Sequence, residues 1–528
     1  MPSLATAAFV SFLASTAALE PSIANQQSPT PSLLANAPSV VLHVTLKRQA
    51  LEIHGHSEFD VYANPVVSID NSSVFYDGYA EFLEGDVQFK YLFVGGIAYV
   101  VETNSSDPLS RATAQCFQSN IPFDSVIAAL NEPTPIPSAS VGDEAVACST
   151  GNLFKTSFDG EDFALCASGA SGFTAFGSEM DIEVKYMDHP VNISAPRLNN
   201  TSCPVVETSA FVMPTALALI TGGDIPVSSS RNLKVAKHME MGTSTCSCKS
   251  TPRPCIFFHG LGNENEEKEL QDSSRHWGDM AKRAPCCTIV KYAALNTVDH
   301  GWTEPRLQQN FCDRALSMSD TSDAESSTIE DTIVVTHSMG GLVMSGALAT
   351  GKCSFGDSAT WVSLSAPMTG SMASDYLQDF CNDEISSFAM EIFELTGQCP
   401  MDPSRKSTMY QNEKYSSKEL NAAYIAAQEA YRSNITTALC SNSYVGVFSK
   451  YQAISIIAGK SVPHKSPEND CLVEFQSCAF GLDASLFGNS FTDKFYMPEL
   501  NHADTSFRTR DGLFKKSQKP AKWFECLL

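Results

Sequence analysis

Positive charge is the scarcest property of this chain, because 35 Lys and Arg stand against 59 Asp and Glu and leave a formal net charge of −24. An acidic protein repels both the phosphate backbone of nucleic acids and anionic lipid headgroups. We therefore expect no nucleic-acid partner and no electrostatic adsorption to an anionic membrane. The acidic surface is interpreted as a source of solubility in a secreted protein.

Long apolar runs are also scarce, and the principal one stands at the start of the chain. Residues 4–19 carry no charge, and small residues suited to signal cleavage follow, although no Lys or Arg precedes the run. We interpret residues 1–24 as a secretory signal peptide. An uncleaved anchor is the alternative, which the shortness of the run disfavours. The run at 211–220 is shorter still, so no other segment is expected to cross a bilayer.

Cysteine is abundant, but paired C-x-x-C modules of the kind that bind zinc are absent. The 17 cysteines are scattered along the chain, which favours disulfides and an oxidising compartment. Their odd number leaves at least one thiol free or intermolecular. Four of them precede residue 230 and could form two bridges confined to the N-terminal half: Cys116, Cys148, Cys166 and Cys203. Sequons also support secretion and occur at Asn71, Asn104, Asn192, Asn199, Asn200 and Asn434.

The first half of the chain has the pattern of a β protein. Apolar and polar residues alternate in several stretches of residues 39–227, and Gly95-Gly96 and Asp159-Gly160 are hairpin signals between such stretches. The pattern predicts a β-rich accessory domain, an antiparallel sheet or half-barrel, with one helix from Asp124 to Leu130. A concave sheet of this kind could hold a lipid chain. Residues 228–254 are polar and aperiodic, which predicts a linker that proteolysis could cut.

The second half, residues 255–528, alternates strands with helices. This alternation predicts an α/β domain with a mostly parallel sheet, helices on both faces, and ligands at the carboxyl ends of the strands. A helix is predicted over 305–318. The predicted strands cover 255–258, 288–294, 332–336, 360–365 and 451–458.

An insertion interrupts this alternation at residues 372–445, and we predict that it forms a helical cap over the site. Its apolar residues could line an acyl pocket or simply pack the cap onto the core: Phe380, Ile385, Phe388, Ile392, Phe393 and Leu395. Cys381, Cys399 and Cys440 could staple the cap and favour a fixed cap over an opening lid.

The stretch Thr336-His337-Ser338-Met339-Gly340-Gly341 follows a β-branched run and precedes a helix-compatible segment. This pattern predicts a nucleophile elbow, a strained turn that lifts the hydroxyl of Ser338 above the sheet edge. A second strand ends at His259-Gly260-Leu261-Gly262. The backbone N–H groups of Leu261 and Met339 are therefore predicted to form an oxyanion hole.

His502, in a loop after an aromatic run, is the predicted base. The acid is sought between serine and histidine, and Asp470 in Glu468-Asn469-Asp470 is preferred. Its rivals are Glu468, Asp483 and Asp504. The remaining histidines receive other roles or none: His259 shapes its loop, His337 is a packing or substrate-wall residue, and His276, His300 and His464 have no evident partner.

These segments occur in the order seen in α/β-hydrolase lipases. Together with Ser365–Ser371, Asn469–Val473 and Leu500–Asp504, they make residues 252–528 resemble bacterial triacylglycerol lipases, in which Asn-Asp-Gly-Leu-Val carries the acid and Asn-His the base. The chain departs from that pattern at Thr336 and Cys471, both glycine in the family. The resemblance implies an α/β-hydrolase fold and a lipid or acyl-ester substrate.

The predicted function is a secreted serine hydrolase that cleaves acyl esters through an acyl-enzyme, with no metal or organic cofactor. Some lipases of this kind carry a structural calcium, but the sequence shows no cluster of residues that we would assign as its binding site. One alternative keeps the triad but acts as a thioesterase, phospholipase or acyltransferase. Another is a non-catalytic, disulfide-bonded surface binding protein. In a third, the N-terminal half is a propiece or inhibitor. Contact with a lipid surface and the oligomeric state stay open.

Overall fold

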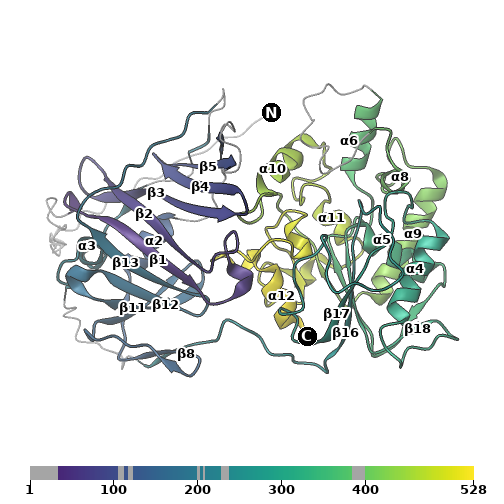
Figure 1. Cartoon of the computed structure of the whole chain (residues 1–528), viewed down its shortest axis with the longest axis horizontal. Coiled ribbons are helices and arrows are strands. Elements are labelled where there is room, and N and C mark those ends of the chain that lie inside the picture. The colour runs from purple at the N-terminus through teal and green to yellow at the C-terminus, as the bar shows by residue number, and fades with distance from the viewer. Residues whose placement is uncertain are drawn as a thin grey trace, which may run out of the picture.

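The computed structural model of the protein describes residues 34–104, 112–116, 123–198, 203–205, 209–226, 237–382 and 399–528. The predicted signal peptide and the sequons at Asn199 and Asn200 lie outside these ranges. Figure 1 shows two bodies side by side, an N-terminal one in purple and blue and a C-terminal one in green and yellow. Among the described helices, none combines the length and apolar character that a bilayer span requires.

The N-terminal body is a 12-stranded sheet in which every pair of neighbouring strands is antiparallel. Its spatial order is β6-β5-β4-β3-β2-β1-β13-β12-β11-β10-β7, and β14 pairs with β3. The strands are β1 (Ser39–Leu46), β2 (Glu58–Val67), β3 (Ser73–Glu84), β4 (Val87–Val94), β5 (Ile97–Asn104), β6 (Thr113–Cys116), β7 (Thr134–Pro135), β10 (Leu153–Phe158), β11 (Glu161–Ala167), β12 (Phe173–Gly177), β13 (Met180–Met187) and β14 (Ala210–Phe211).

Both predicted hairpins are confirmed. Gly95 and Gly96 have φ of 60° and 77° between the paired residues Val94 and Ile97. Asp159 and Gly160, at 48° and 82°, join β10 to β11 in the same way. Two consecutive positive φ angles match the right-handed twist of the flanking strands, which is why glycine and aspartate occupy these turns. The predicted helix is α2 (Phe123–Asn131), and α3 (Pro214–Thr221) is a second one.

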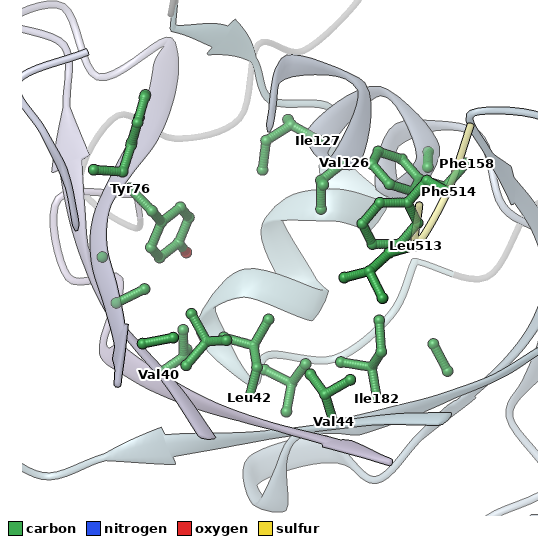
Figure 2. Close-up of a pocket in the computed structure, with 18 of the residues that line it drawn as sticks. Val40, Leu42, Val44, Tyr76, Val126, Ile127, Phe158, Ile182, Leu513 and Phe514 are labelled. Atoms are coloured by element: carbon green, nitrogen blue, oxygen red, sulfur yellow. The ribbon is translucent and has the colours of Figure 1, made fainter. Parts of the chain in front are cut away.

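The curled sheet and these two helices surround an apolar cavity of about 350 Å³. Figure 2 shows Val40, Leu42 and Val44 of β1 on one side of it, with Leu513 and Phe514 of the C-terminal half opposite.

The C-terminal body contains a seven-stranded sheet whose paired strands are all parallel, which confirms the predicted sheet. Alternate residues of a buried strand face opposite sides. Ile256 and Phe258 therefore join one core, and Cys255 and Phe257 join the other. The strands, in spatial order, are β17 (Cys287–Ala293), β16 (Arg253–Phe258), β19 (Ile333–His337), β21 (Thr360–Leu364), β22 (Thr437–Leu439), β24 (Phe495–Tyr496) and β23 (Phe487–Gly488).

Helices cover both faces of this sheet. The first core includes residues of α4 (Pro305–Leu316), α5 (Met339–Ala349) and α9 (Lys418–Asn434). Trp523 and Phe524 of α12 (Pro520–Leu527) belong to the second core. The other elements are β8 (Ala139–Val141), β9 (Glu144–Ala145), β15 (Met239–Met241), β18 (Thr328–Ile329), β20 (Ser354–Phe355), α6 (Met372–Cys381), α8 (Pro403–Ser407), α10 (Gln452–Ser461) and α11 (Phe475–Cys478).

The prediction of a strand over 451–458 is wrong, because this segment forms α10. Its buried residues are Gln452, Ser455 and Ala458, which recur every three positions as on one face of a helix. The next strand of the sheet is instead the three-residue β22. It lies inside the predicted cap segment, as does α9, which packs on α5. Ile385, Phe388, Ile392, Phe393 and Leu395 lie outside the described residues.

Sixteen of the 17 cysteines form eight disulfides, and the buried Cys471 is free. The N-terminal half has the two internal bridges Cys116–Cys203 and Cys148–Cys166. Cys381–Cys399 lies in the predicted cap, but Cys440 pairs with Cys478 and does not staple it. The remaining bridges are Cys246–Cys526, Cys248–Cys286, Cys255–Cys287 and Cys312–Cys353.

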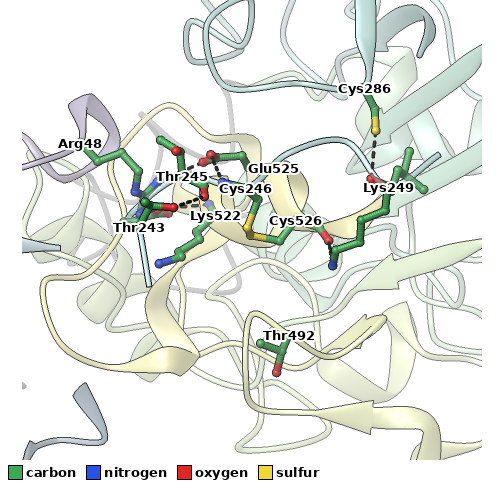
Figure 3. Close-up of a disulfide and its surroundings, with 12 residues drawn as sticks. Arg48, Thr243, Thr245, Cys246, Lys249, Cys286, Thr492, Lys522, Glu525 and Cys526 are labelled. Atoms are coloured by element: carbon green, nitrogen blue, oxygen red, sulfur yellow. Dashed lines mark hydrogen bonds and ion pairs between the residues drawn. A yellow bond between two sulfur atoms is a disulfide. The ribbon is translucent and has the colours of Figure 1, made fainter. Parts of the chain in front are cut away.

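The predicted linker is fastened to both bodies. Its strand β15 pairs with β8 in the first half. Its two cysteines, Cys246 and Cys248, are bonded to the second half. Figure 3 shows the Cys246–Cys526 bridge beside Glu525, which accepts a hydrogen bond from the backbone N–H of Cys246 at 2.7 Å.

Buried charges join the two bodies at this place. The guanidinium of Arg48, whose side chain is 6% exposed, contacts Asp511 at 2.5 Å and Glu179 at 3.1 Å. It also lies 3.6 Å from Glu525, and Lys522 pairs with Glu179. The interface therefore contains several desolvated charges that are paired with one another as ions. We name Arg48, Glu179, Asp511, Lys522 and Glu525 the interbody cluster.

Candidate active site

Ser338 occupies a strained turn between β19 and α5. Its φ of 55° and ψ of −133° lie where a non-glycine residue is rarely found, and its N–H donates to the carbonyl of Leu364 at 2.9 Å. Two glycines permit the turn. A Cβ added to Gly340 would lie 2.7 Å from the His259 carbonyl oxygen, and one added to Gly260 would lie 2.5 Å from Cβ of Ser338. The serine turn and the loop after β16 are thus in direct contact.

Ser338, His502 and Asp470 form a chain of hydrogen bonds. Oγ of Ser338 lies 2.9 Å from Nε2 of His502, and Nδ1 of His502 lies 2.8 Å from Oδ2 of Asp470. A carboxylate can only accept, so Nδ1 carries the imidazole proton and Nε2 accepts from the serine hydroxyl. The exposed fractions are 7% for Ser338, 8% for His502 and 1% for Asp470. The structure thus brings Ser338 and His502 together across 164 positions of the chain, and His502 and Asp470 across 32.

The acid is held by its own loop. Oδ1 of Asp470 accepts the backbone N–H groups of Leu472 at 3.1 Å and Val473 at 2.8 Å, which leaves Oδ2 for the histidine. The N–H of His502 donates to the carbonyl of Asp470 at 2.8 Å. Cys471, the residue after Asp470, has a φ of 83°. Glycine adopts this left-handed conformation most readily, and the lipase pattern has glycine at this position.

Two further histidines, His337 and His464, contact the backbone next to the residues of this hydrogen-bond chain. Nε2 of His337 lies 3.2 Å from the carbonyl of His502 and 3.1 Å from the hydroxyl of Thr505, and the two imidazole rings lie 4.7 Å apart. Burial, and then the neighbouring His502, lower the pKa of His337 well below its ordinary value. His464 bonds the buried Glu474 at 3.0 Å and approaches the carbonyl of Cys471 at 3.2 Å. The sequence predicts a packing or substrate-wall role for His337, but its partners, 165 and 168 positions away, could not be foreseen. It predicts no partner for His464, although Cys471 and Glu474 are only seven and ten positions away.

The rival acids have other partners. Asp504 is buried and accepts the N–H groups of Val447 and Asn501 and the hydroxyl of Thr509. Asp483 caps a short 3₁₀ helix through the N–H of Ser485, and Glu468 is exposed. Asp470 is the carboxylate that bonds His502 in the described part of the chain.

His259 shapes its loop, in agreement with its predicted role. Its Nδ1 bonds the carbonyl of Gly260 at 2.9 Å, and its Nε2 accepts the N–H of Leu295 at 3.2 Å. Burial lowers the pKa of His259 to about 4 and that of the stacked His276 to about 3. Both imidazoles are therefore neutral at pH 7. Among the described residues, no group of three or more His, Cys, Asp or Glu is placed to hold a metal ion.

The threonine at position 336 has a defined partner. Its buried hydroxyl accepts a hydrogen bond from the indole Nε1–H of Trp361 on the neighbouring strand, at 3.0 Å. A glycine at this place would leave that buried donor unpaired. The side chain thus explains why the elbow departs from the usual pattern.

Thr336→Val is expected to lower the free energy of unfolding by about 1–3 kcal/mol, because it orphans the Trp361 donor while keeping the size of the side chain. Urea denaturation measures the change. The same substitution in a Trp361→Phe background serves as the control, since no donor remains there to be orphaned. Equal costs in the two backgrounds would contradict the assignment.

Comparisons with known proteins give no family. No protein-family model matches the chain, and no curated protein matches it at a significant level. Among solved structures, a mature lipase from Bacillus licheniformis matches at 15% identity and a TM-score of 0.33, over 49% of this chain and 88% of its own. A Staphylococcus hyicus lipase matches at 14% and 0.29, over 54% and 95%. A metagenomic carboxyl esterase matches at 12% and 0.26, over 57% and 80%. Overlaps at this level establish neither a shared family nor a shared activity.

Proposed function

We propose that the protein is a serine hydrolase of acyl esters, with a lipid or a simpler ester as its substrate. The observation that carries this proposal is the hydrogen-bond chain from Ser338 through His502 to Asp470. In this chain the serine is the nucleophile, the histidine is the base and the aspartate orients the histidine. Acyl transfer by a serine hydrolase requires these three groups in contact in this order. The strained conformation of Ser338 supports the same role, because strain of this kind is kept where function needs it.

The proposed reaction proceeds in two stages. Oγ of Ser338 attacks the acyl carbon while Nε2 of His502 takes its proton, and Asp470 stabilises the resulting imidazolium. The backbone N–H groups of Leu261 and Met339 are proposed to hold the oxyanion, since Leu261 follows the glycine in contact with the serine and Met339 begins α5. His502 then protonates the departing alcohol. In the second stage His502 takes a proton from water as the water oxygen attacks the acyl carbon. The bond from that carbon to Oγ of Ser338 then breaks, His502 returns the proton to Oγ, and the free acid leaves.

We also propose that the protein is secreted or resides in the secretory pathway. Eight disulfides need an oxidising compartment to form and persist. We therefore place the protein in the lumen of the secretory pathway or outside the cell.

A fluorophosphonate probe tests the nucleophile. We expect covalent labelling of the wild type and none of Ser338→Ala. Ser345→Ala is the matched control, because Ser345 is a buried serine of α5 whose hydroxyl bonds only the helix backbone and a methionine sulfur. Labelling of the control with none of Ser338→Ala supports the proposal. A folded wild type that stays unlabelled would favour the non-catalytic binding protein.

The acyl donor is tested with p-nitrophenyl esters of rising chain length beside an acyl thioester. Turnover of the oxygen esters supports the proposed class. Turnover of the thioester alone would replace it with the thioesterase alternative, which uses the same three residues.

A further inference from the structure

The cavity of the N-terminal body is lined by carbon. Its walls come from nine strands and two helices of the first half: β1, β2, β3, β4, β5, β10, β11, β12 and β13, with α2 and α3. Three residues of the second half, Phe448, Leu513 and Phe514, complete them. None of the lining residues is charged. Figure 2 shows aliphatic and aromatic side chains converging on the open centre.

Most polar atoms of the lining residues are already bonded to the protein. The hydroxyl of Tyr186 donates to the carbonyl of Leu219 at 2.5 Å, and that of Thr156 donates to Ala129 at 2.5 Å. The hydroxyl of Tyr91 bonds Nε2 of His54 at 2.7 Å. Water in a buried site needs two to four polar partners, and this cavity does not supply them. An apolar guest fits the lining better than water does.

The volume of the cavity and the hydroxyl of Tyr76 indicate which class of ligand it could bind. The volume of about 350 Å³ lies within the range of small-molecule sites. Tyr76 directs its hydroxyl toward the centre, where it can donate to a carboxyl or ester oxygen.

We propose that this cavity binds a single unbranched acyl chain, for which dodecanoyl compounds serve as probes. The chain comes either from a free fatty acid or from an esterified lipid, since both present the same hydrocarbon and an oxygen at its end. Residues of both bodies line the site, so the intact chain is required to form it. The proposal stands independently of hydrolysis at Ser338.

Binding is tested on the full-length Ser338→Ala variant, which cannot consume an ester through the proposed nucleophile. Isothermal titration calorimetry with dodecanoic acid and with methyl dodecanoate is the measurement. We expect saturable binding of one molecule per chain. Binding of the acid alone assigns a free fatty acid as the source, and binding of the ester alone assigns an esterified lipid.

Two positions on β1 make a matched pair. Leu42 lines the cavity, whereas the next residue, His43, lies outside it and pairs with Asp60 on the other face of the sheet. Leu42→Trp is expected to weaken binding at least about tenfold by occupying the space of the chain, whereas His43→Trp leaves it unchanged. Ile182→Phe, on β13, replaces Leu42→Trp if the latter fails to fold.

Two results would overturn the proposal. One is the absence of saturable binding by either ligand to the folded protein. The other is equal affinity in the Leu42→Trp and His43→Trp variants, which would place the ligand elsewhere. Neither result bears on labelling at Ser338, so a failure here is distinct from a failure of the proposed hydrolase activity.

Discussion

Ser338→Ala is expected to lower kcat/KM for an acyl ester by about 10⁵-fold or more, because the nucleophile of a triad acts as a unit with its base. The loss should appear in kcat, since the hydroxyl reacts rather than binds. His502→Ala should cost a similar factor, and the double variant should cost no more than either single one. Initial rates with p-nitrophenyl esters measure these changes.

The controls for this series separate chemistry from folding. Each variant should keep the circular dichroism spectrum and the thermal midpoint of the wild type to within a few degrees, because one hydroxyl or imidazole at a strained site adds little stability. Ser345→Ala should retain its activity. Residual activity of a tenth or more in Ser338→Ala would exclude this serine as the nucleophile.

Arg48→Met is expected to lower the free energy of unfolding by about 3–5 kcal/mol, because it takes the guanidinium away from the buried Asp511 and leaves Glu179 with Lys522 as its remaining partner in the interbody cluster. Glu179 and Asp511 are 3% and 0% exposed at their side chains and would lose the guanidinium that they share. Since Glu179 belongs to the first body and Asp511 to the second, we also expect faster proteolysis between the bodies. Urea denaturation and timed digestion measure the two effects.

An exposed pair provides the comparison for Arg48. Lys185 lies 2.8 Å from Glu183, with 56% and 44% of their side chains exposed. Lys185→Met should therefore change stability by no more than about 1 kcal/mol. If Arg48→Met costs as little as Lys185→Met, the interbody cluster does not hold the two bodies together.

The sequence predicts those structural features that depend on a few adjacent residues. The strained turn at Ser338 follows from a short motif, and the Gly95-Gly96 hairpin turn from two glycines. The proximity of His502 to Ser338 could be expected because His502 lies in the loop after the parallel strand β24, and such loops meet at one edge of the sheet. Asp470 follows the helix α10 and not the predicted strand, so only its place between serine and histidine in the chain pointed to it.

Other features depend on contacts that no local pattern records. The segment 451–458 is a short apolar run, and such a run suits a strand or a helix equally until its buried neighbours are known. The strand β22 is only three residues long. Arg48 and Asp511 are 463 positions apart, and the cavity exists only where Phe448, Leu513 and Phe514 meet the first half.

The bridge between Cys246 and Cys526 gives the chain an unusual covalent topology. It closes residues 246–526 into a ring, with the two cysteines 280 positions apart. No disulfide joins the β-rich half to that ring, since all 17 cysteines are assigned. A cut before Cys246 would therefore detach the first half from the ring covalently and leave only the interbody contacts. A cut between Cys248 and Arg253, a few residues later, would keep every part tethered, because the Cys246–Cys526 and Cys248–Cys286 bridges both span it and still close a covalent ring.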